Sequence, residues 1–234
     1  KKVHPTPIIF PNGNKVEVAI RRNIKTRQFT LRLSTLDGRI TLTAPKFASD
    51  YCIQDFIKKK MAWLTKNVAL LPAVIPVKFG IKVPVNGFLC AIKPYDGNKT
   101  KIIGDNELYI PREKNVKIAV KEYLKGVAEK QFKYYTDLFS HDLKACYKKI
   151  SLKDPRSRWG SCSADGSIMY SWRLAMSPDY VLSYVAAHEV AHLIHLDHSK
   201  AFWKQVEDLY GDYRKPRQWL KKNGVALHLY KLGS

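Results

Sequence analysis

Apolar and polar residues alternate along much of the first part of the chain, between residues 16 and 44. The segments 29–33 and 40–43 have the period of two that places successive side chains on opposite faces of a strand. An Asp-Gly pair between them is a typical turn sequence. We therefore expect antiparallel strands here. Short apolar runs over 77–110, separated by further turn sequences, extend the β-rich part.

Two other segments have a helical period. Apolar residues recur every three or four positions over 53–64, and Ser49 or Asp50 precedes them as a candidate N-cap. The same period continues from about residue 111 to residue 138, which corresponds to roughly eight turns. The first pattern predicts a helix of moderate length, and the second predicts a long one.

The segment 155–174 has the pattern of a hairpin, because apolar residues alternate along its second half and Ala-Asp-Gly supplies a turn. Ser-Pro-Asp then provides an N-cap and a proline at the first helical position, so the next helix should begin at Pro178. Together these elements predict an α+β protein. We expect an antiparallel β-rich part over 1–112, followed by a long helix and a catalytic core over 113–234.

That last helix contains a metal-binding pattern. His188-Glu189-Val190-Ala191-His192 matches H-E-x-x-H about three turns into the helix. Positions i and i+4 share one helix face, so the two imidazoles can bind one ion while Glu189 projects toward a water molecule on that ion. We therefore expect His188 and His192 to be zinc ligands and Glu189 to be a general base.

A catalytic zinc ion needs a third protein ligand beside an open position for water. His195 lies about 10 Å along a continuous helix from His188, which is too far for both to bind one ion. His198 follows His192 by six residues and can reach the ion if the helix ends near His195 and the chain reverses. This is the spacing of H-E-x-x-H-x-x-G-x-x-H, with histidine in place of the glycine. We expect His198 to be the third ligand, with Glu207 as the alternative.

Several short runs surround this pattern: RWGSC at 158–162, SWRL at 171–174, YV at 184–185 and HSKAFW at 198–203. On these runs and H-E-V-A-H, the chain resembles the YgjP-like metallopeptidase family and is more remotely similar to SprT-like proteases. The resemblance implies a small zincin-like core with zinc bound by the residues named above. The labels of this family include both metallopeptidase and UTP pyrophosphatase, so it leaves the substrate open. Ser171 stands where the family has asparagine.

Three arginines are candidate substrate-binding residues. Arg156 and Arg158 should project from the same face of the expected hairpin, and Arg173 could approach them from the partner strand. If this patch overlooks the metal, its guanidinium groups can hold a carboxylate or a phosphate in bidentate geometry. The alternative is that they face solvent or pair with Asp154.

Composition and charge narrow the setting. Apolar residues make up 45% of the chain and charged residues 26%, as in ordinary globular proteins, and no run of 18 apolar residues indicates a membrane span. The four cysteines form no C-x-x-C pair, and no secretory signal is recognisable, so we expect a cytoplasmic protein. The net charge is +21, and residues 1–75 carry nearly half of it, so this basic part could bind nucleic acid or another polyanion.

The residues thus favour a zinc-dependent hydrolase that cleaves peptide bonds in a peptide or protein substrate, with a zinc-bound water and Glu189 as the general base. Two alternatives stay open. The same metal site could serve a UTP pyrophosphatase, or the protein could be a non-catalytic nucleic-acid-binding protein with structural zinc.

Overall fold

The computed structural model of the chain describes residues 4–9, 15–34, 38–104 and 106–233. It confirms a mixed α+β protein with a β-rich N-terminal part and C-terminal helices. The chain divides into two compact units, Lys1–Ala73 and Val74–Ser234. This division falls after residue 73, whereas the boundary expected at 112 separates the β-rich part from the helical core. The strands after residue 74 bury their apolar residues in the same core as the long helix, which places them in the second unit.

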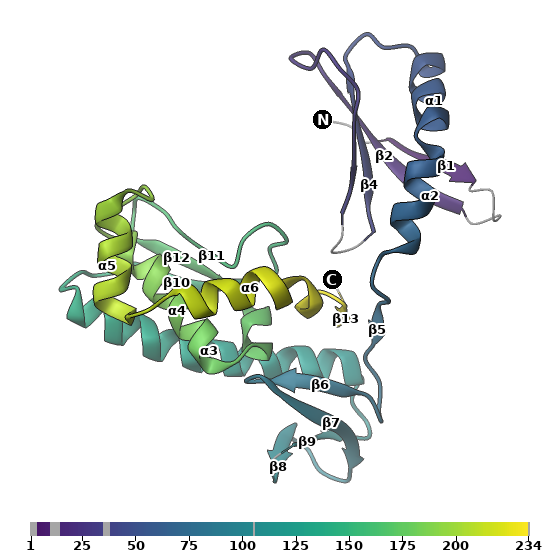
Figure 1. Ribbon diagram of the computed structural model, residues 1–234. Coiled ribbons are helices and arrows are strands. Elements are labelled where there is room, and N and C mark those ends of the chain that lie inside the picture. The colour runs from purple at the N-terminus through teal and green to yellow at the C-terminus, as the bar shows by residue number, and fades with distance from the viewer. Residues whose placement is uncertain (1–3, 10–14, 35–37, 105, 234) are drawn as a thin grey trace. The chain divides into compact units, whose positions relative to one another are not determined.

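The first unit is a four-stranded sheet with helices packed on one face (Figure 1). Val18, Ile40 and Leu42 of the sheet and Ile53 and Leu64 of the helices belong to its buried core. In chain order its elements are β1 (His4–Ile9), β2 (Lys15–Asn23), β3 (Thr30–Leu33), β4 (Ile40–Pro45), α1 (Asp50–Lys59) and α2 (Met61–Ala69).

The strand pairing in this unit differs in one respect from the expectation. Strand order is β1-β2-β4-β3, and β4 pairs antiparallel with β3 but parallel with β2. The expected antiparallel pairing is present between β3 and β4 and between β1 and β2. The parallel pairing of β2 with β4 was not expected, because alternation fixes which face a side chain occupies but not the direction of the neighbouring strand. The expected N-cap is present: the Ser49 side chain accepts a hydrogen bond from the Cys52 amide, 3.2 Å away.

The second unit begins with a small mixed sheet of strand order β6-β7-β9-β8, which leads into the long helix α3. Asn115 caps α3, because its side chain accepts hydrogen bonds from the amides of Lys117 and Ile118. The helix spans 27 residues, as its long period predicted. The elements are β5 (Ile75–Pro76), β6 (Lys82–Val85), β7 (Phe88–Tyr95), β8 (Lys101–Ile103), β9 (Glu107–Pro111) and α3 (Val116–Asp142).

A second sheet lies at the other end of α3, with strand order β10-β12-β11 (Figure 1). Its strands are β10 (Lys149–Lys153), β11 (Gly160–Cys162) and β12 (Ser167–Ser171). The ring of Phe132 on α3 stacks on Tyr170 of β12 at 3.9 Å, and the hydroxyl groups of Thr136 and Tyr170 are 2.9 Å apart. These buried contacts fix the sheet to the helix.

The predicted hairpin is present between β11 and β12, which pair antiparallel. It is shorter than expected at both ends. Residues 154–159 form a loop before β11, and Trp172–Met176 is a 3-10 helix, η1, instead of a continuation of the strand. All five residues of η1 are buried. The apolar residues in this segment are therefore buried on every side and do not mark one face of a strand.

The helices α4 (Asp179–Ala191), α5 (Lys200–Tyr210) and α6 (Arg214–Leu227), with β13 (Tyr230–Lys231), complete the unit. Pro178 stands at the N-cap, so α4 begins one residue later than expected. Figure 1 shows α4 between α3 and the two last helices. This placement surrounds α4 with protein and explains why ten of its residues are buried. In the described part of the chain, no helix is both long and apolar enough to cross a membrane.

Candidate metal centre

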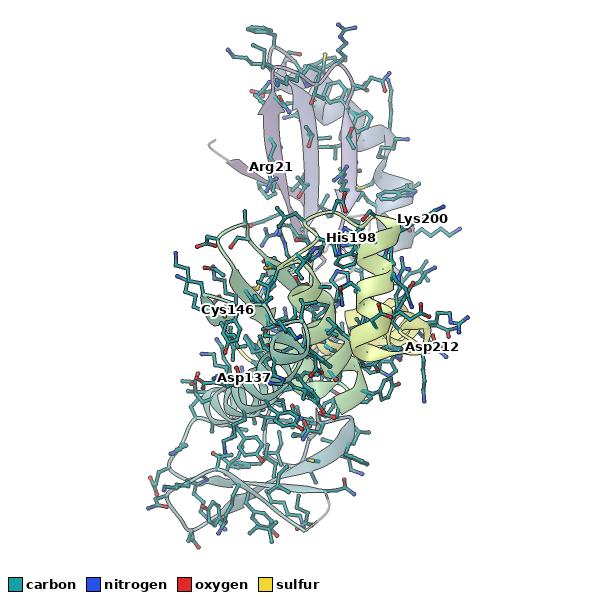
Figure 2. All side chains as sticks on the ribbon, turned by 90° about the vertical axis from the view of Figure 1, so that its left-hand side faces the viewer. Arg21, Asp137, Cys146, His198, Lys200 and Asp212 are labelled. Atoms are coloured by element: carbon teal, nitrogen blue, oxygen red, sulfur yellow. The ribbon has the colours of Figure 1, made fainter. Side chains whose placement is uncertain are left out.

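Helix α4 and the loop that follows it position three imidazole groups. His188 lies in the last turn of α4, and His192 forms its C-cap. The chain then reverses, so that His198 precedes α5, whose N-cap Ser199 accepts a hydrogen bond from the Phe202 amide. Figure 2 shows His198 at the start of α5, beside Lys200. The cap fixes the loop end that carries His198.

The three predicted ligands are brought together. The ligand atoms of His188, His192 and His198 all lie within 4.8 Å of one another, and the Nε2 atoms of His188 and His198 are 3.2 Å apart. Two imidazole nitrogens bound to one tetrahedral zinc ion at the usual bond length are about 3.3 Å apart. The donor set and its spacing therefore fit a zinc ion with three nitrogen ligands.

The backbone of the loop fixes the orientation of one ligand. His192 Nδ1 lies 2.8 Å from the carbonyl oxygen of His195. A carbonyl group only accepts hydrogen bonds, so Nδ1 carries the proton and leaves Nε2 with a free lone pair for a metal ion. His195 thus acts through its backbone. The φ angle of His195 is not positive, so the backbone at this position does not require a glycine.

Burial keeps the imidazoles in the form that binds metals. The low-polarity surroundings, together with His192, His198 and Arg217, lower the pKa of His188 to about 3. Burial also lowers the pKa of His192. Both rings are therefore neutral near pH 7, and neutral imidazole is the form that donates a lone pair to a metal ion.

Glu189 lies against β11 rather than in the ligand set. It is 5% exposed, and its Oε2 atom is buried without a hydrogen-bond partner among the described residues. A Cβ atom added to Gly160 would lie 2.5 Å from Glu189 Oε1. Glycine at position 160, in the RWGSC run, therefore leaves the room that the Glu189 carboxylate needs.

Burial also changes the acidity of Glu189. It raises the pKa of this carboxyl group to about 8, against the opposing effects of the Arg158 charge and a hydrogen bond from the Cys162 backbone. A carboxylate with a raised pKa is a stronger base than one in water. The pKa of this carboxyl group thus lies close to neutral pH, where the group can both gain and lose a proton.

These groups share one pocket of about 510 Å³. Residues 157–161 line it together with His188, Glu189, His192 and His198, and Leu220 of α6 contributes to it. Tyr184 also lines the pocket. Sequence reasoning assigned no role to this tyrosine, although its position four residues before His188 places it on the same helix face.

The three arginines do not form one patch. Arg158 is exposed and lines the pocket, as expected for a substrate-binding residue. Arg156 is exposed in the same loop but does not line the pocket. Arg173 is 7% exposed and donates hydrogen bonds to both carboxylate oxygens of Asp154 and to the carbonyl groups of Leu227 and Tyr230. We therefore withdraw Arg173 from the substrate-binding set, because its charge is neutralised in the interior.

The acidic residues close to the histidines in sequence do not belong to the group of three ligands. Among the described residues, Glu207 does not belong to a cluster of three potential ligands, and it is exposed on α5. Asp197 accepts a hydrogen bond from the Ser199 amide, and Asp208 pairs with Lys204. These acids thus serve the loop and the helix surface, and His198 is the better candidate for the third ligand.

The basic N-terminal unit presents arginines on one face of its sheet. Arg32 is paired with Thr41 across β3 and β4, and Arg21 with Thr43 across β2 and β4, so both lie on the face opposite Leu42 (Figure 2 labels Arg21). The sheet therefore carries part of the basic charge of residues 1–75 on the face opposite Leu42. It identifies no nucleic-acid partner, which stays a prediction.

The comparisons agree with the site. The model of the YgjP-like metallopeptidase domain matches residues 29–223, a region that includes α3, the hairpin and the three histidines. No curated protein and no solved structure matches the chain. Since the family match covers most of the chain and contains the whole metal centre, the chain belongs to the YgjP-like metallopeptidase family.

Proposed function

We propose that this protein is a zinc-dependent peptidase in which His188, His192 and His198 hold the ion and Glu189 is the general base. The observation that carries the proposal is the convergence of three imidazoles and one buried carboxylate on a single pocket. Family membership supports a metallopeptidase type of function. The choice of zinc rests on the all-nitrogen ligand set.

A zinc ion bound to these histidines supplies Lewis-acid catalysis, because it polarises the scissile carbonyl group and makes water more acidic. The protein supplies the rest. The His195 carbonyl group holds the His192 ring in the ligand tautomer, and Ser199 fixes the loop end that carries His198. The ligands are thus held in place before the substrate arrives, which lowers the cost of reorganisation during the reaction.

Glu189 moves the proton. Its carboxylate takes a proton from the attacking water and passes it to the nitrogen of the leaving amine. The raised pKa of this carboxyl group suits both steps, since the group must gain the proton and then lose it. Gly160 lets the carboxylate lie directly on the backbone of β11.

The position of β11 favours an extended peptide as the substrate. This strand lies at the edge of its sheet, and its first two residues, Gly160 and Ser161, line the pocket. A peptide can add to such an edge through backbone hydrogen bonds, independently of its sequence. That mode would carry the scissile bond along the pocket past Glu189.

The test is a side-by-side incubation of the zinc-loaded protein with casein, a peptide pool and the four nucleoside triphosphates. We expect peptide products from the wild type. Glu189→Gln should retain zinc and lose activity by about two to four orders of magnitude. Glu129→Gln is the matched control, since it removes the same charge from an exposed position on α3. Accumulation of UMP and pyrophosphate without any peptide cleavage would replace the peptidase by a pyrophosphatase.

A further inference from the structure

A second arginine lies beside the metal centre, far from the hairpin in sequence. Arg217 is exposed on α6, and its guanidinium carbon lies 4.9 Å from the centroid of the Trp203 ring. The same ring lies 5.6 Å from the ring of His188 and 5.9 Å from that of His198. One indole ring therefore lies close to both the Arg217 guanidinium group and two of the ligand rings.

The stacking arrangement limits where the guanidinium can move. Trp203 is itself stacked on Tyr213 at 4.9 Å, so its ring is held from a second side. A guanidinium on a fixed aromatic face keeps its N–H groups free at the edge of its plane, where they can form hydrogen bonds with an anion. Arg217 is thus positioned like a binding residue instead of a mobile surface cation.

Arg158 and Arg217 have no acidic partner among the described residues. Other arginines of this unit do: Arg112 pairs with Asp96, and Arg214 pairs with Asp212. Arg158 lines the pocket, and Arg217 lies over the Trp203 ring, which is next to the rings of His188 and His198. Two guanidinium charges without carboxylate partners therefore act on the same pocket from different elements, the loop before β11 and helix α6.

The charge balance of the pocket then favours an anionic substrate. The three imidazoles carry no charge, so a bound divalent ion and the two guanidinium groups would give the site an excess of positive charge even when Glu189 is ionised. A substrate without negative charge would leave this excess uncompensated in a partly desolvated site. A peptide carboxylate matches the planar fork of arginine.

We propose that Arg158 and Arg217 select peptide substrates that carry a carboxylate close to the scissile bond. This inference rests on the proposed peptidase function and narrows it to a substrate class. The carboxylate can come from the C-terminus of the peptide or from an Asp or Glu side chain. Either source offers two oxygens to the guanidinium N–H groups.

Binding is measured on the zinc-loaded Glu189→Gln protein, which should hold peptides without cutting them. Three peptides with the same central sequence and an N-terminal fluorophore distinguish the sources: one with a free C-terminus, one amidated, and one amidated with a glutamate near its centre. We expect fluorescence anisotropy to give an affinity about 10- to 100-fold higher for a carboxylate-bearing peptide than for the neutral one. The difference between the two carboxylate peptides identifies the source.

Arg217→Ala in this background should abolish most of that preference and leave binding of the neutral peptide unchanged. Arg217→Lys should restore part of it, because lysine keeps the charge but not the fork. Arg214→Ala is the matched control: it removes the same residue type from the same helix, where Asp212 already occupies its guanidinium group. We expect it to bind like the parent protein.

Two results would overturn the inference: equal affinity for neutral and carboxylate peptides, or equal losses in Arg217→Ala and Arg214→Ala. Nucleoside triphosphates that bind through Arg217 while no peptide binds would also overturn it, in favour of a phosphate ligand. Failure of the peptidase function itself is distinguishable, because it requires that the active protein cleaves no peptide at all. Cleavage of all three peptides at one rate would refute only the carboxylate selection.

Discussion

Replacement of Gly160 by alanine should separate the position of Glu189 from the metal site. The added methyl group would lie 2.5 Å from Glu189 Oε1, 2.6 Å from its Cγ and 2.7 Å from its Cδ. Ordinary contacts of a Cβ atom begin at 3.4 Å, so the carboxylate must move by about 0.9 Å. Because the clash includes Cγ and the side chain is 5% exposed, rotation of the carboxylate alone cannot relieve it.

A displacement of about 1 Å at a catalytic group costs on the order of 100-fold in rate. We therefore expect Gly160→Ala to lower kcat by about that factor. Overpacking of this kind also lowers the free energy of unfolding by about 1–3 kcal/mol. Zinc content should stay unchanged, since Glu189 is not in the ligand group. Initial rates on a peptide substrate, elemental analysis and thermal denaturation measure the three quantities.

Gly126→Ala is the control for this experiment. Gly126 lies within α3, and an added Cβ atom would meet nothing within 4 Å. Alanine in a helix interior stabilises by about 0.5–1 kcal/mol relative to glycine, so this variant should be more stable and equally active. Wild-type activity in a folded, zinc-loaded Gly160→Ala protein would refute the assigned position of the general base.

Four other predictions follow from the structure. His198→Ala should lose most of its zinc in elemental analysis, whereas retention of the metal would move the third ligand elsewhere, with Glu207 the first candidate. Arg173→Met should lower the free energy of unfolding by about 1–3 kcal/mol in urea titrations, because it leaves the carbonyl groups of Leu227 and Tyr230 without their donor. A loss of activity without destabilisation would instead return Arg173 to the substrate-binding set. Hydrogen bonds from two serines and a lysine hold the pKa of Asp165 well below its usual range, so this carboxylate stabilises the fold above pH ~4 and the stabilisation is lost on acidification. The difference in unfolding free energy between wild type and Asp165→Asn should therefore shrink at low pH. A difference that grew at low pH would contradict the reasoning. Any affinity for nucleic acid should lie in residues 1–73 and decrease steeply with salt, and a chain that starts at residue 74 and keeps salt-sensitive binding would disprove this.

Local patterns predicted the parts of the site that lie within a few residues of one another. The i, i+4 spacing of His188 and His192 determines a shared helix face. His198 could be proposed because a loop of six residues has few ways to return. These features depend on backbone geometry that repeats in all proteins.

Contacts between distant segments could not be predicted in this way. Arg217 lies near the metal centre only because the turn between α5 and α6 brings it onto Trp203. The spacing of residues along a helix or strand does not predict the direction of such a turn. Arg173 was placed with the pocket because its neighbours alternate, but η1 turns it inward to Asp154. The parallel pairing of β2 with β4 was missed for the same reason, since a strand carries no local mark of its neighbour.

The hydrogen bonds of Arg173 also impose an order on folding during synthesis. The carbonyl groups that it binds belong to residues 54 and 57 positions later in the chain. Until that segment has left the ribosome, the Arg173 guanidinium group of the nascent chain lacks two of its hydrogen-bond acceptors. The 3-10 helix η1 then lacks its hydrogen bonds to the end of α6 and to β13. We expect the metal centre to mature only after α6 has emerged. Activity in ribosome-bound chains arrested before residue 227 would contradict this order.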